Sequence, residues 1–309
     1  MHRAGRFAGT RRSGIICRKI GGAKSSGRVA GLMIFKNLNM QKEFTNLIPQ
    51  NTSVEFALAA HDFQSGEEIL MNPDLPFHPA STMKLCVMME VFHQARMNIF
   101  SLDDSIIVKN NFASIADGSD YSLLAEDDSE QELYQLIGQP LTVRELTRRM
   151  IVVSSNLATN LLIERVKPDP VTEFMRLLGA DGLIVRRGVE DNKAFRLGIN
   201  NAATARGFMN VLMKLEMREV VSQKDSDEMI RILLGQQFNE MIPFYLPADV
   251  RVAHKTGWTG KYFHDIGIVY PPNRKPFVLA ILTNGFEKEE DAHPFVASLA
   301  KKFYDGWIK

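Results

Sequence analysis

Two residues that could perform nucleophilic chemistry, Ser81 and Lys84, lie together in the segment FHPASTMKLCVMMEVF, residues 77–92. At positions i and i+3 of a helix, two side chains lie on the same face, so the Lys84 amine could reach the Ser81 hydroxyl. The apolar residues that follow predict a buried helix, and burial lowers the pKa of a lysine. A neutral Lys84 could then accept a proton from Ser81. Ser-x-x-Lys is frequent by chance, however, and Ser81 could equally be an ordinary helix N-cap.

Two further short motifs follow in the chain. SSN (154–156) is expected where one helix ends and the next begins, and KTG (255–257) ends a predicted strand. Alone, each motif also fits a helix cap or a strand end. In the order Ser-x-x-Lys, Ser-x-Asn and Lys-Thr-Gly, however, the three together are a specific indication of a serine acyl-transfer site.

The elements that must position these motifs follow from hydrophobic periodicity. Alternation over 54–60 and a second run over 68–71 predict a β-hairpin. Capping signals and helical periodicity predict helices in the middle of the chain over 142–153, 156–165, 171–178, 203–216 and 225–234. Strand patterns return over 251–256, 264–270 and 277–283, and a helix is expected over 291–309.

This order predicts an α+β fold, in which the N- and C-terminal parts form one antiparallel sheet flanked by helices and the middle forms an inserted, all-helical lobe. We expect a single catalytic domain over 46–309, with a mixed lobe (46–84 and 246–309) and a helical lobe (85–245). The site would lie in the cleft between the lobes. Residues 1–45 are expected to be a basic leader, disordered or non-native, because Met1–Lys42 holds ten Lys or Arg residues and no acid.

Composition excludes several classes of function. With 309 residues, 45% of them hydrophobic, and a formal charge of +1, nothing favours a nucleic-acid partner, and no apolar stretch has the length of a membrane span. Cys17 and Cys86 fit no zinc or disulfide pattern, and the acids of 117–132 lack the spacing of a calcium loop, so they are read as a solvated loop or helix face. We expect no metal, no cofactor and a monomer. No convincing signal peptide precedes the domain, which leaves the location open and favours the cytoplasm over export.

From about Val54 to its C-terminus, the chain resembles the class A β-lactamase group of serine hydrolases, which is related to penicillin-binding proteins. Besides the three motifs, LTVREL (141–146), SSNLATNLL (154–162) and DIGIVYPP (265–272) carry the resemblance. It implies Ser81 as the nucleophile, Lys84 as base or proton relay, and Ser154 as the group that passes a proton to the leaving amine. By the same resemblance, substrate would be held by Asn156, Lys255, Thr256, Gly257 and Trp258. The backbone N–H groups of Ser81 and Trp258 would form the oxyanion hole.

The resemblance also implies a glutamate that activates water for deacylation, and Glu190 has the family spacing, 190 − 154 = 36 residues after Ser154. An exposed loop acid is the alternative reading of Glu190. Three departures from the family surround these motifs: Ala194 replaces an asparagine, Gly188 an arginine and Ser155 an aspartate. The candidate replacements for the missing asparagine are the amides of Asn192, Asn200 and Asn201.

Three functions therefore remain open. The first is β-lactam hydrolysis through a Ser81 acyl-enzyme. The second is an amidase, esterase or D,D-peptidase-like hydrolase of the same fold, with slow or no β-lactam turnover, and the third is a non-catalytic relative that binds a ligand. His61, His254 and His264 show no metal-ligand spacing and are expected to be packed or solvent-facing. Trp258 could line the cleft or cover the core.

Overall fold

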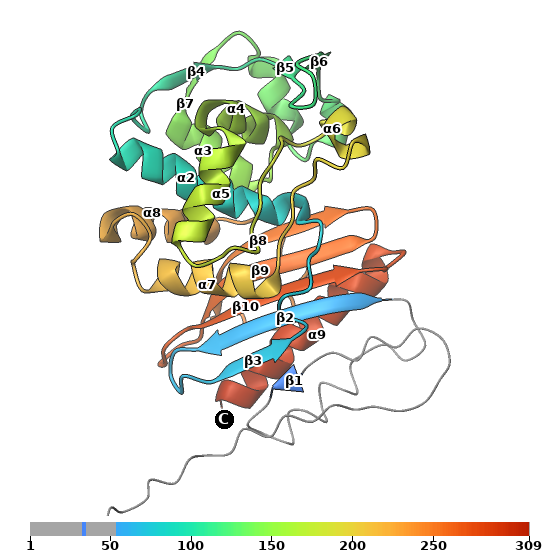
Figure 1. The fold of residues 1–309 in the computed structure, drawn as a ribbon. Coiled ribbons are helices and arrows are strands. Elements are labelled where there is room, and N and C mark those ends of the chain that lie inside the picture. The colour runs from blue at the N-terminus through green and yellow to red at the C-terminus, as the bar shows by residue number, and fades with distance from the viewer. Residues whose placement is uncertain (1–32, 35–53, 309) are drawn as a thin grey trace, which may run out of the picture.

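The computed structural model describes residues 33–34 and 54–308 (Figure 1). Apart from residues 33–34, the predicted leader (1–45) lies outside these residues, and so does Cys17. Within the described part, no helix is long and apolar enough to cross a membrane.

The centre of the molecule is a six-stranded sheet in the order β1-β3-β2-β10-β9-β8, in which every neighbouring pair is antiparallel. Its strands are β1 (Met33–Ile34), β2 (Glu55–Asp62), β3 (Glu68–Met71), β8 (Arg251–Thr259), β9 (Tyr262–Tyr270) and β10 (Phe277–Asn284). The pairing of β2 with β10, with Leu58 opposite Ile281, joins the two ends of the described chain. The predicted hairpin, the predicted meander and the α+β fold class are confirmed.

Both faces of the sheet are covered by helices. In β10, seven consecutive residues from Phe277 to Thr283 are buried, as expected for a central strand with a layer on each side. Helix α9 (Glu289–Ile308) covers one face with the buried side chains of Val296, Leu299 and Phe303. Helix α7 (Ala205–Glu216) contacts β2 and β10, so it belongs to the sheet layer and not to the helical lobe in which we had placed it (Figure 1).

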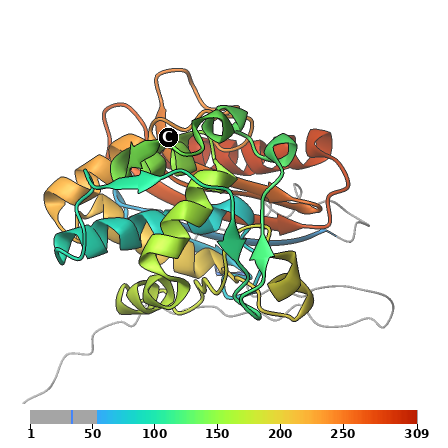
Figure 2. The ribbon, with the colours of Figure 1, turned by 90° about the horizontal axis from the view of Figure 1, so that it is seen from above.

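The remaining helices form the second lobe, which lies over the sheet when the molecule is viewed from above (Figure 2). They are α2 (Lys84–Arg96), α3 (Val143–Val152), α4 (Asn156–Val166), α5 (Pro168–Leu177), the short α6 (Asn192–Arg196) and α8 (Gln223–Leu233). Three short 3-10 helices accompany them: η1 (Ala80–Met83), η2 (Ala125–Asp127) and η3 (Gln131–Leu136). Helix α2 lies at the centre of this arrangement, and its residues 84–92 are all buried.

The insertion is not all-helical, and that expectation is wrong. It contains two short ladders, β4 (Ser105–Ile107) with β7 (Pro140–Thr142) and β5 (Phe112–Ala113) with β6 (Asp120–Tyr121). The predicted capping box at the start of α3 forms only in part. Thr142 Oγ1 accepts a hydrogen bond from Glu145 N at 3.1 Å, but the Glu145 carboxylate pairs with Arg148 and Arg149 instead of returning to the cap.

Candidate active site

Ser81 lies in η1, the tight turn that leads into α2, and is partly exposed. This turn packs against the edge strand β8 at Gly257. A Cβ atom at Gly257 would lie 2.8 Å from Ser81 N and 2.7 Å from Thr82 N. A glycine is therefore needed for β8 to approach the backbone of Ser81 so closely.

The loop in front of Ser81 is held by a buried histidine. His264 Nδ1 accepts a hydrogen bond from Thr283 N at 3.1 Å, so its Nε2 carries the proton and donates to His78 O at 2.8 Å. Burial lowers the pKa of His264 to about 4, so the ring is neutral. His254 is bonded in a similar way to Asp265, with Nδ1 3.0 Å from Oδ1. Both histidines are packed and hydrogen-bonded, as expected, and within the described chain no cluster of three or more potential ligands could hold a metal ion.

Lys84 is the first residue of α2 and is fully buried. Its Nζ donates to Ser154 O at 2.6 Å, to Asn156 Oδ1 at 2.8 Å and to Ser154 Oγ at 3.3 Å. Burial lowers the pKa of Lys84 to about 7, although the nearby carboxylates of Asp128 and Glu190 oppose this shift. Near neutral pH, a large fraction of Lys84 is therefore the free amine.

A second buried lysine approaches the same hydroxyl from the sheet. Lys255, on β8, donates from Nζ to Ser154 Oγ at 3.0 Å and to Thr256 O at 2.8 Å. Burial, and then the proximity of Lys84, lowers the pKa of Lys255 well below its ordinary value, while Asp265 opposes this shift. The Ser154 hydroxyl can therefore accept a hydrogen bond from Lys255 and exchange its proton with Lys84.

Glu190 is connected to this centre through Asn156. Asn156 Nδ2 donates to Glu190 Oε1 at 2.9 Å, while Asn156 Oδ1 accepts from Lys84. Burial raises the pKa of Glu190, and the charges of Asp128 and Asp127 add to the rise, whereas Asn156 and Lys84 oppose it. The structure thus brings together Lys84, Ser154, Asn156, Lys255 and Glu190.

The loop of Glu190 lacks the family's arginine, and other residues hold it. Asn160, on α4, binds Val189 in both directions, with Val189 N donating to Oδ1 at 2.8 Å and Nδ2 donating to Val189 O at 3.0 Å. A Cβ atom at Gly188 would lie 2.5 Å from Asn160 Oδ1, so a larger residue would disturb this contact. The buried guanidinium of Arg187 donates to Ile199 O at 3.1 Å and to Gly188 O at 3.0 Å.

The far side of the loop is tied to the β5–β6 hairpin by Asp191. Its carboxylate accepts from Ser114 Oγ at 2.8 Å and from Ile115 N at 2.9 Å, and it also caps α6 by accepting from Ala194 N at 3.0 Å. Lys193 adds an ion pair with Asp117. These contacts anchor the backbone on both sides of Glu190.

The three candidate replacements for the family's asparagine either bind other groups or are exposed. Asn201 Oδ1 accepts from the backbone N–H groups of Arg186 at 2.8 Å and Arg187 at 3.1 Å, and Asn200 Oδ1 accepts from Arg187 at 3.4 Å. The Asn192 side chain is exposed. Ala194 itself is fully buried. The Glu190 carboxylate instead accepts a hydrogen bond from Asn156 Nδ2.

Trp258 follows Gly257 on the edge strand β8. Its side chain is 52% exposed, so it does not cover the core, which removes one of the two expectations for this residue. Thr256, in contrast, is nearly buried.

Sequence reasoning missed one residue near the site, Asp128. Its acidic segment was expected to be solvated, but the Asp128 carboxylate is 5% exposed and accepts from Asn156 N at 3.0 Å and Leu157 N at 2.8 Å. The expectation of a solvated acid is therefore wrong for Asp128. The one signal in the sequence was indirect: the motif that carries Asn156 has Ser155 where the family has an aspartate.

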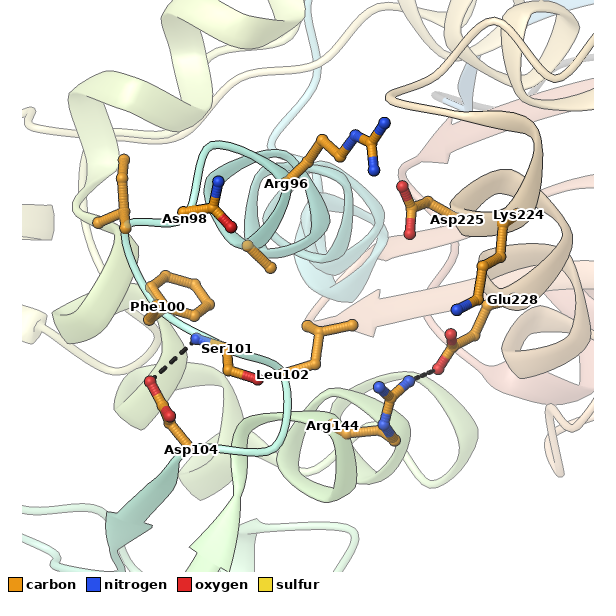
Figure 3. Close-up of a pocket in the computed structure, with 12 residues that line it drawn as sticks. Arg96, Asn98, Phe100, Ser101, Leu102, Asp104, Arg144, Lys224, Asp225 and Glu228 are labelled. Carbon is orange, nitrogen blue, oxygen red and sulfur yellow. Dashed lines mark hydrogen bonds and ion pairs between the residues drawn. The ribbon is translucent and has the colours of Figure 1, made fainter.

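A separate cavity of about 590 Å³ lies at the far end of α2, between α3 and α8 (Figure 3). Its lining includes Arg96, Phe100, Arg144 and Glu228, and Arg144 forms an ion pair with Glu228 across one side. It contains none of the predicted site residues.

The comparisons with known proteins agree with this architecture. The chain belongs to the β-lactamase enzyme family, whose model matches residues 39–307. It is 29% identical over 172 residues to the carbapenem-hydrolyzing β-lactamase KPC of Klebsiella oxytoca, a match that covers 54% of this chain and 59% of that protein. It is 23% identical over 253 residues to the extended-spectrum β-lactamase PER-1 of Pseudomonas aeruginosa, which covers 79% of each chain. The fold is also that of a β-lactamase from Chitinophaga pinensis, with a TM-score of 0.75 and 20% identity over 87% of this chain and 99% of that one.

Proposed function

We propose that this protein is a serine hydrolase that forms an acyl-enzyme on Ser81 and hydrolyses the amide bond of β-lactams. Membership of the β-lactamase enzyme family supports the proposal, as do the names of the relatives KPC and PER-1. The observation that carries it is that two buried lysines, Lys84 and Lys255, contact the same Ser154 hydroxyl. Lys84 lies one helical turn after Ser81 in the sequence. All the residues involved come from one chain, so we propose that a monomer is sufficient.

Acylation follows from the protonation states of this centre. The free amine of Lys84, whose pKa is about 7, takes the proton of Ser81 as the Ser81 oxygen attacks the carbonyl carbon. Ser154 then gives its hydroxyl proton to the departing nitrogen and takes one in return from the protonated Lys84, whose Nζ lies 3.3 Å away, so that Ser154 is again a hydroxyl and Lys84 again a free amine. The N–H groups of Ser81 and Trp258 stabilise the oxyanion, and Lys255 with Thr256 attracts the substrate carboxylate.

Deacylation is assigned to Glu190. Its carboxylate would accept a proton from the water that attacks the acyl-enzyme, and the raised pKa of Glu190 makes it a stronger base than an ordinary glutamate. Asn156 holds that carboxylate at 2.9 Å while also binding Lys84, so it links the two halves of the reaction.

A slower hydrolase of another amide or ester, including a D,D-peptidase-like enzyme, is the second candidate. It is favoured by the fully buried Ala194, which offers no side-chain amide to hold water beside Glu190. A non-catalytic relative is disfavoured, because burying Lys84 and Lys255 is energetically costly and binding alone does not require it.

The test is to follow the mass of the purified protein and the loss of substrate after a penicillin is added. We expect an adduct on Ser81 that turns over, no adduct in Ser81→Ala, and in Glu190→Gln an adduct that is released about 100- to 1,000-fold more slowly. Glu126→Gln, at an exposed acid, is the matched control and should behave as the wild type. A persistent wild-type adduct would favour the second candidate, and the absence of both adduct and turnover would exclude β-lactams as substrates.

A further inference from the structure

The segment Asp128–Glu130 crosses the junction between α3 and α4, which carries Ser154 and Asn156. The Asp128 carboxylate is buried and accepts from the first backbone N–H groups of α4, those of Asn156 at 3.0 Å and Leu157 at 2.8 Å. It also accepts from Tyr134 OH at 3.0 Å and from Glu130 N at 3.1 Å. Four donors thus hold this side chain in one position.

The next two residues bind the other side of the junction. Ser129 Oγ donates to Val153 O at 2.6 Å, and Val153 directly precedes Ser154. The Glu130 carboxylate forms an ion pair with Arg149 in the last turn of α3. Residues 128–130 therefore attach to the chain both before and after Ser154.

This junction needs external support because of its backbone geometry. Ser154 has a φ of +57°, a left-handed conformation that costs a non-glycine residue about 1–2 kcal/mol. Helix α4 begins two residues later, at Asn156, with N–H groups that lack partners within the helix. A negative charge at this end is favourable, and Asp128 supplies both the charge and the acceptors.

Ser155 explains why this carboxylate comes from outside the motif. The Ser155 hydroxyl caps α4 by accepting from Ala158 N at 3.2 Å, and it lies close enough to Glu130 to lower the pKa of that carboxyl, which burial raises. An aspartate at position 155 would be a third carboxylate beside Asp128 and Glu130. Like charges at such separations destabilise one another, so Asp128 and an aspartate at position 155 are alternatives.

We propose that residues 128–130 are a positioning element in which Asp128 fixes the Ser154 and Asn156 side chains for acyl transfer. The inference rests on the proposed function, and Asp128 acts only through the residues it holds. The link to the chemistry is short, because Lys84 Nζ binds both Ser154 O and Asn156 Oδ1. The charged groups that face Lys84 are Asp128, Glu190 and Lys255, and the negative charge of Asp128 raises the pKa of Lys84 against the effect of burial.

A double-mutant cycle tests the proposal, using Asp128→Ala, Ser155→Asp and the double variant. The readout is the acylation rate constant at saturating penicillin, measured from pH 6 to 9 below the thermal transition of each variant. We expect Asp128→Ala to lower this constant about 100-fold with little change in the half-saturating concentration, because misplacement of about 1 Å has effects of this size. The pH at which acylation reaches half of its plateau should also fall, since the pKa of Lys84 falls when Asp128 is removed and the free amine then persists to lower pH.

The direction in which Ser155→Asp changes the acylation rate constant distinguishes positioning from general destabilisation. Ser155→Asp should slow acylation in the wild type but restore it at least about tenfold in the Asp128→Ala background. Asp127→Ala, which removes an exposed acid one residue away, should remain within about twofold of the wild type. If Asp128→Ala does not fold, Ser129→Ala removes only the bond to Val153 O, and we expect an acylation loss of about tenfold.

The positioning role would be overturned if the effects of Asp128→Ala and Ser155→Asp simply multiplied. It would also be overturned if both Asp128→Ala and Ser129→Ala acylated normally. In either case, an adduct on the wild type would still support the proposed function. Failure of the wild type to form any adduct would instead reject the proposed function, and with it this inference.

Discussion

The centre around Lys84 and the loop around Glu190 meet in one hydrogen bond, from Asn156 Nδ2 to Glu190 Oε1, but they are built in different ways. The centre contains two titratable side chains that are removed from water on regular elements, Lys84 on α2 and Lys255 on β8. The loop is irregular, and it is held by hydrogen bonds between side chains and backbone groups: Asn160 binds Val189, Arg187 binds Gly188 O, and the Asp191 carboxylate binds Ile115 N.

This difference explains which residues can depart from the family. In the centre, each group has a proposed chemical role that depends on its own side chain, so we expect no other residue type to replace it. In the loop, the requirement is only that the backbone at Glu190 be fixed, and contacts of several kinds can meet it. Loss of the family's arginine at Gly188 is thus compatible with an ordered loop, because Asn160 and Asp191 hold the segments on each side.

The largest effect that separates the two regions is expected at Gly257. In Gly257→Ala, the new Cβ would lie 2.7–2.8 Å from the Thr82 and Ser81 nitrogens, so β8 must move away from η1. We expect an acylation rate constant about 100-fold lower, because a displacement of about 1 Å misaligns the attacking oxygen and the oxyanion donors. Release of an adduct already formed should change less.

Gly260→Ala is the matched control, since a Cβ there meets no atom within 4 Å although its φ is +55°. It should lower the thermal midpoint and leave acylation within about twofold of the wild type. If Gly257→Ala and Gly260→Ala lowered the acylation rate constant equally, the geometry of the strand, rather than its contact with Ser81, would limit acylation.

The pH dependence should separate the regions next. The base form of Lys84 is the neutral amine, which accumulates above its pKa of about 7. Acylation should therefore rise about tenfold between one pH unit below that value and one unit above it, as single-turnover kinetics can measure. The base form of Glu190 is the carboxylate, which is protonated as the pH falls. Because the pKa of Glu190 is raised, deacylation should be lost at a higher pH than it would be with an ordinary glutamate. An acylation rate that is flat across this range would exclude Lys84 as the base.

The smallest effect is expected in the loop, at Gly188. In Gly188→Ala, the added methyl group meets Asn160 Oδ1 at 2.5 Å, and Asn160 cannot move freely because it binds Val189 in both directions. We expect deacylation to slow several-fold, up to about tenfold, with acylation unchanged, because Val189 directly precedes Glu190. Gly198→Ala, beyond α6, is the control: its φ is +76°, so the substitution should lower stability, but open space surrounds its Cβ and deacylation should not slow. Slower acylation in Gly188→Ala would show that the two regions are more strongly coupled than one hydrogen bond suggests.

Periodicity in the sequence predicted the sheet and most helices to within a few residues. It predicted α7 but not its place against the sheet, because an amphipathic helix carries no mark of the layer on which it packs. It also missed the two-residue strands β5 and β6, which are too short to show a pattern. The proposed site residues were predicted from local motifs. Asp128 was not, since its partners at Asn156 and Leu157 lie 28 and 29 residues away.

By itself, the sequence determined the chemical groups of this protein, which are a serine and a lysine one helical turn apart, a Ser-x-Asn motif, a Lys-Thr-Gly motif and an acid at the family spacing. The tertiary structure decided their state: burial lowers the pKa of Lys84, two lysines converge on Ser154, and Asn156 joins them to Glu190. The reason is physical. A residue's type is local information, whereas its desolvation and its hydrogen-bond partners depend on segments that only folding brings together.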